Sequence, residues 1–172
     1  MRLRSLVIAG ALLAPLSAPM SALAQTWTNY DYPDAGFAVH FPAAPTVATS
    51  TYRTAAGVTV PATTWSARHE NVVYTVTTAD FSKNKVEPEK AIDDAVKTFN
   101  AEGEIKLDVD ARISQRYGHE LSVAGKDGSW STVAIFFFND KLYQLHGKAA
   151  PPDPTARSSR LIRFQQSLQF PG

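Results

Sequence analysis

Cysteine is absent from all 172 residues of the chain. Its absence excludes disulfide bonds, thiolate nucleophiles and thiolate metal ligands, and it leaves no cysteine to carry a lipid anchor. The only two methionines, Met1 and Met20, lie within the first 24 residues. A domain formed by residues 25–172 would therefore contain no sulfur atom, and functions that depend on sulfur chemistry are excluded.

Neither sign of charge dominates the composition. Seventeen Lys and Arg residues face sixteen Asp and Glu residues, which gives a formal net charge of +1. Removal of the first 24 residues, with Arg2 and Arg4, would leave fifteen bases against the same sixteen acids and a formal net charge of −1. A balance this close to neutral gives no electrostatic basis for binding nucleic acid or an anionic membrane surface. We therefore expect no nucleic-acid partner.

The chain also lacks an apolar run long enough to span a bilayer. A basic start at residues 2–4 is followed by an apolar run over residues 6–16 and then by small residues, which is the order found in signal peptides. We expect residues 1–24 to be such a signal peptide. The residues that define the cleavage site are Ala22, Ala24 and Gln25. The sequence thus predicts export to the periplasm, with no transmembrane anchor after cleavage.

Residues 25–172 are long enough for a single globular domain with a sizeable core. Short runs rich in Val, Thr, Phe and Tyr alternate with turn residues, which is typical of an antiparallel sheet. The strands are expected at about 27–32, 37–41, 46–54, 58–68, 72–80, 104–115, 119–124, 129–138 and 141–147. The unbroken apolar run from Val133 to Phe138 predicts a central strand that is covered on both faces.

Two segments have the spacing of helices. In residues 88–101, the apolar residues recur three or four positions apart, opposite a row of charged residues. Pro88 suits the first turn of this helix and Gly103 suits its end. A second helix is expected at about 155–167. Together these patterns predict an α+β domain in which a curved antiparallel sheet is covered by helices on its faces.

Three motifs resemble one family of proteins. Residues 36–42 read GFAVHFP, residues 141–145 read KLYQL, and residues 163–168 read RFQQSL. Their order resembles small exported bacterial domains of the PsbP-like superfamily. This resemblance implies an α/β/α sandwich built on a curved antiparallel sheet. The best-known relatives are extrinsic lumenal subunits of photosystem II, which are accessory proteins rather than enzymes. No metal or docking motif of those relatives matches residue by residue, so the resemblance transfers no site.

Candidate catalytic or metal-binding residues are few and scattered. The four histidines are His40, His69, His119 and His146, and no two of them have the spacing of a metal-binding pair. No serine lies in the local motif of a known nucleophile, and no glycine-rich loop could hold a phosphate. We therefore expect no catalytic residues, no cofactor and no metal, although a site assembled from distant histidines stays open.

Two acids and three arginines offer weaker alternatives. Asp108 and Asp110 share one face of their expected strand, opposite Ile105, Leu107 and Val109, and such a pair could bind a cation or act in acid–base chemistry. Simple strand alternation predicts a solvated polar face instead. The candidates for a partner surface are Arg157, Arg160 and Arg163 on the last helix. The aromatic residues that could add to such a surface are Trp27, Trp65, Trp130, Tyr52 and Tyr143.

The sequence therefore predicts an exported, soluble, non-catalytic accessory or binding domain. Its partner would be an envelope protein or a small ligand. Two alternatives remain: a hydrolase-type enzyme whose site is assembled only in three dimensions, and a structural protein of the envelope. A deep pocket with converging polar groups would favour the enzyme, whereas a shallow exposed aromatic patch would favour a partner site.

Export with cleavage after Ala24 makes a direct prediction. Mass spectrometry of the N-terminus of the protein from an envelope fraction should find Gln25 as the first residue. Protein that retains Met1 and fractionates with the cytoplasm would show that the N-terminal segment is not a cleaved signal.

Overall fold

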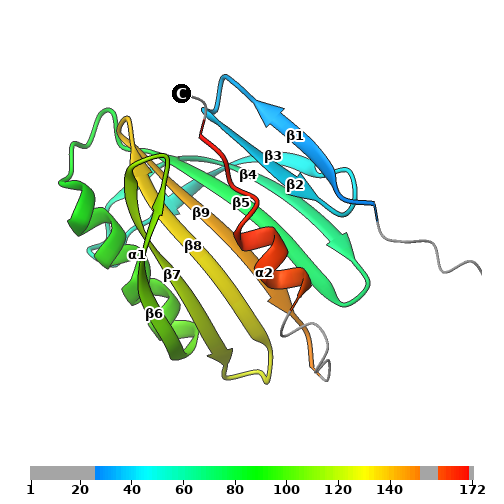
Figure 1. Ribbon diagram of the computed structural model, residues 1–172. Coiled ribbons are helices and arrows are strands. Elements are labelled where there is room, and N and C mark those ends of the chain that lie inside the picture. Colours follow the sequence, from blue (N-terminus) through cyan, green and yellow to red (C-terminus); the bar gives the residue numbers. More distant parts are fainter. Residues whose placement is uncertain (1–25, 152–158, 171–172) are drawn as a thin grey trace, which may run out of the picture.

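A computed structural model describes residues 26–151 and 159–170 of the chain. In these residues the chain forms a seven-stranded antiparallel sheet with the strand order β3-β4-β5-β9-β8-β7-β6, and a separate two-stranded sheet, β1-β2 (Figure 1). The strands of the large sheet are β3 (Thr46–Arg53), β4 (Thr59–His69), β5 (Val72–Asp80), β6 (Gly103–Ile113), β7 (Arg116–Gly125), β8 (Trp130–Phe138) and β9 (Lys141–Ala149). The small hairpin consists of β1 (Thr28–Tyr32) and β2 (Phe37–Phe41).

The two sides of the large sheet are covered by different elements (Figure 1). Helix α1 (Pro88–Glu102) packs on one side, mainly against β6, β7 and β8, and we call this side the α1 face. The β1-β2 hairpin and the short helix α2 (Arg160–Gln165) pack on the other side, which we call the hairpin face. None of the helices in the described segments is long and apolar enough to cross a membrane.

Strand β8 contributes to the core on both faces, as its apolar sequence predicted. Its neighbours in the sheet are β7 and β9, so it lies away from both edges. Val133, Ile135 and Phe137 pack toward α1, whereas Ala134 and Phe136 pack toward the hairpin. Every residue from Ser131 to Phe137 is buried. The prediction of a central strand covered on both faces is therefore confirmed.

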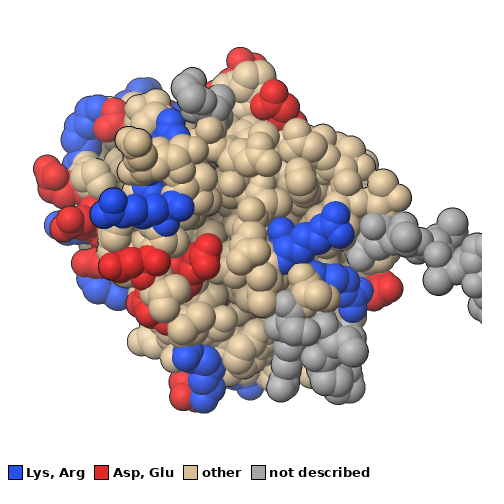
Figure 2. Space-filling model, viewed as in Figure 1, with Lys and Arg blue, Asp and Glu red and all other residues tan. Residues whose placement is uncertain are grey.

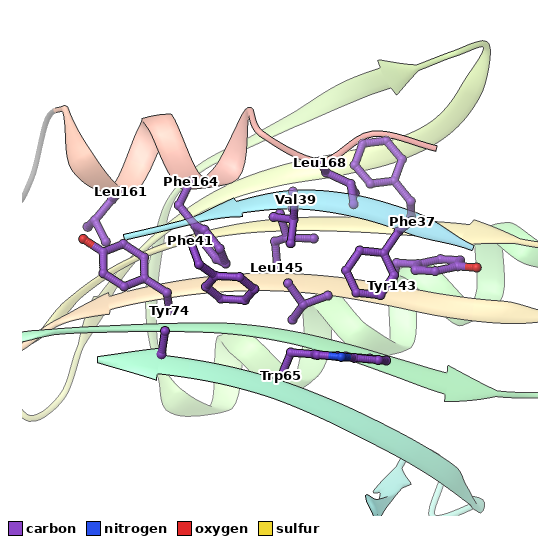
Figure 3. Close-up of a cluster of buried hydrophobic side chains, with 14 of the residues drawn as sticks. Phe37, Val39, Phe41, Trp65, Tyr74, Tyr143, Leu145, Leu161, Phe164 and Leu168 are labelled. Atoms are coloured by element: carbon purple, nitrogen blue, oxygen red, sulfur yellow. The ribbon is translucent and has the colours of Figure 1, made fainter. Parts of the chain in front are cut away.

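The core of the hairpin face is rich in aromatic rings. Figure 3 shows Phe37, Val39 and Phe41 of β2 pointing at the sheet, where they meet Trp65, Tyr74, Tyr143 and Leu145. Leu161 and Phe164 of α2 enter the same cluster from above. The chain after α2 is held as well, because Ala38 and Gln169 exchange two backbone hydrogen bonds of 2.9 Å. The hairpin, α2 and the C-terminal segment thus form one cover.

The prediction of an α/β/α sandwich is confirmed in part. The antiparallel sheet, its strands and helix α1 follow the sequence expectation closely. The hairpin face, however, is covered largely by a hairpin that the sequence patterns placed in the main sheet. Helix α2 spans six residues, fewer than expected, and the expected residues 155–158 lie outside the described part of the chain.

A β-bulge in β6 corrects one expectation. The pairing of β6 with β7 shifts between Ile105 and Leu107, so the alternation of side chains is reset there. Ile105 consequently packs with the core of the α1 face, while Leu107 and Val109 lie on the other face and are 49% and 40% exposed. The grouping of Ile105 with Leu107 and Val109 was therefore wrong, since simple alternation does not foresee a bulge.

Burial of Phe136 gives a prediction for stability. Its ring is fully buried, and it lies edge-on to Phe170 with ring centroids 5.8 Å apart. Phe136→Ala should lower the free energy of unfolding by about 3–5 kcal/mol, because it removes packing and leaves a cavity. Chemical denaturation of both proteins measures this difference. A loss below about 1 kcal/mol would contradict the central position of β8.

Candidate functional site

The two acids of β6 lie beside a histidine and a tyrosine of β7. The strand register places Asp110 opposite His119, and Asp108 is two residues away on the same face. His119 Nδ1 lies 2.6 Å from the Asp108 carboxylate, and His119 Nε2 lies 2.8 Å from the Tyr117 hydroxyl. That hydroxyl donates a 3.0 Å hydrogen bond to Asp110. Sequence reasoning paired Asp108 with Asp110 and considered His119 separately, and the structure brings these residues together with Tyr117.

This network has the order acid, histidine, hydroxyl, but its electrostatics oppose nucleophilic catalysis. The hydrogen bond to Asp110 raises the pKa of the Tyr117 hydroxyl, so the oxygen keeps its proton. A catalytic nucleophile needs the opposite change, toward its deprotonated form. The network therefore acts best as a polar clamp between β6 and β7. Within residues 26–151 and 159–170, no three His, Asp or Glu side chains are grouped so that they could hold a metal ion.

His146 forms a second serine–histidine contact that also lacks the features of a catalytic pair. Its Nε2 lies 2.9 Å from the Ser131 hydroxyl, and Phe99 of α1 packs edge-on at 5.2 Å between ring centroids. Burial, together with the positive charge of Lys148, lowers the pKa of His146 to about 4. A catalytic histidine is oriented by an acid, whereas the charge that acts on His146 is that of a cation, Lys148.

The remaining histidines and the arginines make local contacts. The backbone N–H of His40 donates to the Ser167 hydroxyl at 3.1 Å, and His69 Nε2 lies 3.7 Å from the Glu70 carboxylate. Arg160 of α2 forms an ion pair with that same Glu70. The guanidinium of Arg163 lies 4.9 Å from the centre of the Trp27 ring. Arg157 lies outside the described residues. Arg160 and Arg163 thus anchor α2 to the hairpin face.

Charge is not concentrated on the face of the molecule that Figure 2 shows. Figure 2 shows acidic and basic side chains intermingled toward β6 and β7, whereas the middle of the face is largely uncharged. A surface that mixes both signs in this way gives no field for a strongly charged polymer.

Most of the predicted aromatic candidates belong to the core. Trp27 packs edge-on against Tyr74 at 5.4 Å, and Trp130 is half-buried against the hairpin-face cluster. The buried Tyr143 hydroxyl donates to the Ala35 carbonyl at 3.0 Å. Tyr52 accepts a hydrogen bond from Gln144 on the α1 face. Two of these aromatics also line concave sites: Tyr143 lies in the wall of one beside Arg116, and Trp65 in the wall of another.

A cleft of about 440 Å³ lies between the turn of the β1-β2 hairpin and the β3 side of the large sheet. Trp65 contributes to its wall and is held there by Phe37 and Tyr32, whose ring centroids lie 5.0 and 5.1 Å from the Trp65 ring. The polar residues around Trp65 that matter most are Asp34, Thr49, Thr63, Asp80 and Lys141. We call this site the Trp65 cleft. Its volume lies in the range of sites that bind small ligands or side chains.

The charges around the Trp65 cleft are two carboxylates and one ammonium. Asp80 accepts a 2.8 Å hydrogen bond from the backbone N–H of Ser82, which lowers the pKa of the Asp80 carboxyl and keeps it ionised. Asp34 is exposed in the hairpin turn. Lys141 of β9 lies opposite Asp80 of β5 in the strand register. Its ammonium donates a 3.4 Å hydrogen bond to the Asp34 carbonyl oxygen. These groups suit recognition by charge, hydrogen bonds and ring contact.

Sequence reasoning named Trp65 but missed the rest of the cleft. Its polar residues come from the hairpin turn and from β3, β4, β5 and β9. No local motif joins them. The clamp of Asp108, Asp110, Tyr117 and His119 depends on the two-residue turn at Ser114 and Gln115, which fixes the pairing of Asp110 with His119. The sequence expectation ran a strand through these two residues and therefore missed the pairing.

The architecture is a PsbP-like fold. It is similar to the solution structure of cyanobacterial PsbP (CyanoP) from Synechocystis sp. PCC 6803, with a TM-score of 0.56 and 13% sequence identity over 92% of this chain and 100% of that chain. A protein of unknown function from Pseudomonas aeruginosa is more distant, with a TM-score of 0.40 and 10% identity over 73% of this chain and 83% of that one. No protein-family model matches the sequence, and no curated protein matches it.

The lowered pKa of His146 predicts how stability depends on pH. An unfolded histidine binds a proton near pH 6.5, whereas folded His146 binds one only near pH 4. The contribution of this residue is therefore complete above pH 6.5 and is lost as the pH falls toward 4, by roughly 2 kcal/mol after allowance for solvent.

Denaturation of wild type and His146→Gln between pH 7 and 4 measures this effect. The variant should lose less stability than wild type over that interval, whereas His69→Gln, the same change at a half-buried histidine, serves as the matched control. Parallel pH profiles for wild type and His146→Gln would contradict the assignment.

Proposed function

We propose that this chain is an exported, non-catalytic accessory domain that binds a segment of a protein partner in the Trp65 cleft. The observation that carries this proposal is the cleft itself, where an aromatic ring held by two others meets carboxylates, hydroxyls and an ammonium. Fixed aromatic anchors surrounded by polar groups are characteristic of recognition sites.

The absence of catalysis in this proposal is supported by the two histidine sites. The Tyr117 hydroxyl beside His119 holds its proton more tightly than a free tyrosine, and His146 beside Ser131 has a cation as its charged neighbour. Neither arrangement activates a nucleophile. An accessory role also agrees with the resemblance to PsbP-like proteins, whose best-known members are not enzymes.

Export is the second part of the proposal. It is supported by the signal-peptide pattern of residues 1–24 and by the absence of cysteine, since a cysteine-free domain folds without regard to the redox state of its compartment. A periplasmic domain with a nearly neutral charge would find its partner by shape and local contacts rather than by a long-range field.

Site-specific photo-crosslinking in the producing bacterium tests the binding site. A benzophenone amino acid at Thr63, which lines the Trp65 cleft, should give one discrete adduct with a partner protein. The same amino acid at Asn100, which is exposed on α1, should not give this adduct. A second substitution, Thr49→Trp, should abolish the Thr63 adduct because it fills the cleft. Equal adducts from both positions, or an adduct insensitive to Thr49→Trp, would place the binding site elsewhere.

A further inference from the structure

Within residues 26–151 and 159–170, strand β3 is an edge of the large sheet, and the outer side of its backbone is not paired with another strand. It lies at one end of the strand order, and its partner in the described part of the chain is β4. Seven of its eight residues are exposed, and the eighth, Tyr52, is half-buried. An edge strand presents a row of N–H and C=O groups that can pair with another extended chain.

The register shows which groups of β3 point outward. The N–H of Thr54 donates to the carbonyl of Val58 at 2.8 Å, so these two residues form a hydrogen-bonded pair at the start of the β3-β4 ladder. Antiparallel ladders alternate between hydrogen-bonded and non-bonded pairs, and this one has no register shift. The backbone N–H and C=O groups of Val47, Thr49 and Thr51 therefore point away from β4, toward the free edge.

The two edges of the sheet differ in how they are protected. The other edge, β6, carries a bulge and five charged residues, which discourage pairing with a further strand. From Thr46 to Tyr52, β3 has no charged residue, no proline and no bulge. The same protein thus blocks one edge and leaves the other open, as expected if the open edge has a use.

The open edge and the Trp65 cleft adjoin each other. Thr49, whose backbone points outward, also lines the cleft, and it pairs with Thr63 on the next strand. Val47 pairs with Trp65 itself. A strand added beside β3 would run about 4.8 Å away, so every second side chain would stand on the hairpin face within reach of the cleft.

We propose that an extended segment of the partner adds to the sheet as a strand along β3 and places a Lys or Arg side chain in the Trp65 cleft. This inference rests on the proposed function and specifies its mode of recognition. The carboxylates of Asp34 and Asp80 outnumber the ammonium of Lys141, which favours a cation. The stem of a long basic side chain can also pack on the part of Trp65 that stays exposed, 6% of the residue. In a second copy, Val47, Thr49 and Thr51 of β3 are too short to fill 440 Å³, and the long cation of that strand, Arg53, lies at its end beside Gly57 of the turn.

Three substitutions at Thr49 separate the edge from the cleft. Thr49→Pro removes the outward N–H and breaks no bond to β4, and proline is tolerated at such edge positions. Thr49→Val keeps the N–H and the size of the side chain, so it is the matched control. Thr49→Trp keeps the N–H but fills the cleft. Thermal unfolding should show that all three variants fold.

The probe is a display library of short random linear peptides selected on the immobilised wild-type mature chain. The selected peptides should alternate β-branched residues and carry a Lys or Arg. Thr49→Pro and Thr49→Trp should each weaken binding of a selected peptide by about tenfold or more, and Thr49→Val by less than about threefold. Replacing the basic residue of the peptide by Met should weaken binding to wild type more than to Asp34→Asn.

The outcomes distinguish the two proposals. Peptide binding that is lost in Thr49→Trp but kept in Thr49→Pro would overturn strand addition and leave recognition in the cleft. Binding unaffected by either variant would overturn both. A library without selected binders would overturn strand addition, whereas the cross-linking from Thr63 would still decide the proposed function. A wild-type dimer in solution that Thr49→Pro dissociates would show that a second copy occupies the edge, which also overturns the inference.

Discussion

The apolar sequence of β8 imposes the requirement on which the structure depends. A strand that is apolar on both sides exposes a large hydrophobic area unless both faces of its sheet are covered, and burial of such area is the main driving force of folding. The chain meets this requirement with α1 on one face and with the β1-β2 hairpin and α2 on the other. Helices alone do not supply the cover, which explains why a sheet of seven strands is compatible with the two helices of the described residues.

The use of a hairpin as cover has a consequence for the surface. Phe37, Val39 and Phe41 fix β2 onto the middle of the sheet, and the turn that follows β1 then stands above β4, β5 and β9. The sheet extends beyond this cover to β3, which is exposed on both sides. A hollow at the margin between a cover and an uncovered edge is thus a product of the same packing that buries β8.

The parts of this structure that the sequence predicted are those encoded locally. The periods of two and of three to four residues, together with turn residues, identified α1 and most strands to within two residues, whereas β7 begins three residues before its expected start. The bulge at Ile105 was missed because a register shift leaves the composition of a strand unchanged. The clamp around His119 and the Trp65 cleft were missed for a different reason. Their residues meet only after strands pair, and alternation predicts a face without saying what lies opposite it.

Strand pairing also places two residues opposite each other whose substitutions should be correlated in evolution. Gly118 of β7 lies directly opposite Phe136 of β8, and a Cβ atom at residue 118 would come within 2.4 Å of the Phe136 ring and 2.2 Å of the Ile135 carbonyl oxygen. The ring occupies the space that any side chain at residue 118 would need. Evolution can therefore enlarge residue 118 only if residue 136 shrinks and the backbone of β8 moves, so the two sites should vary together across relatives of this fold.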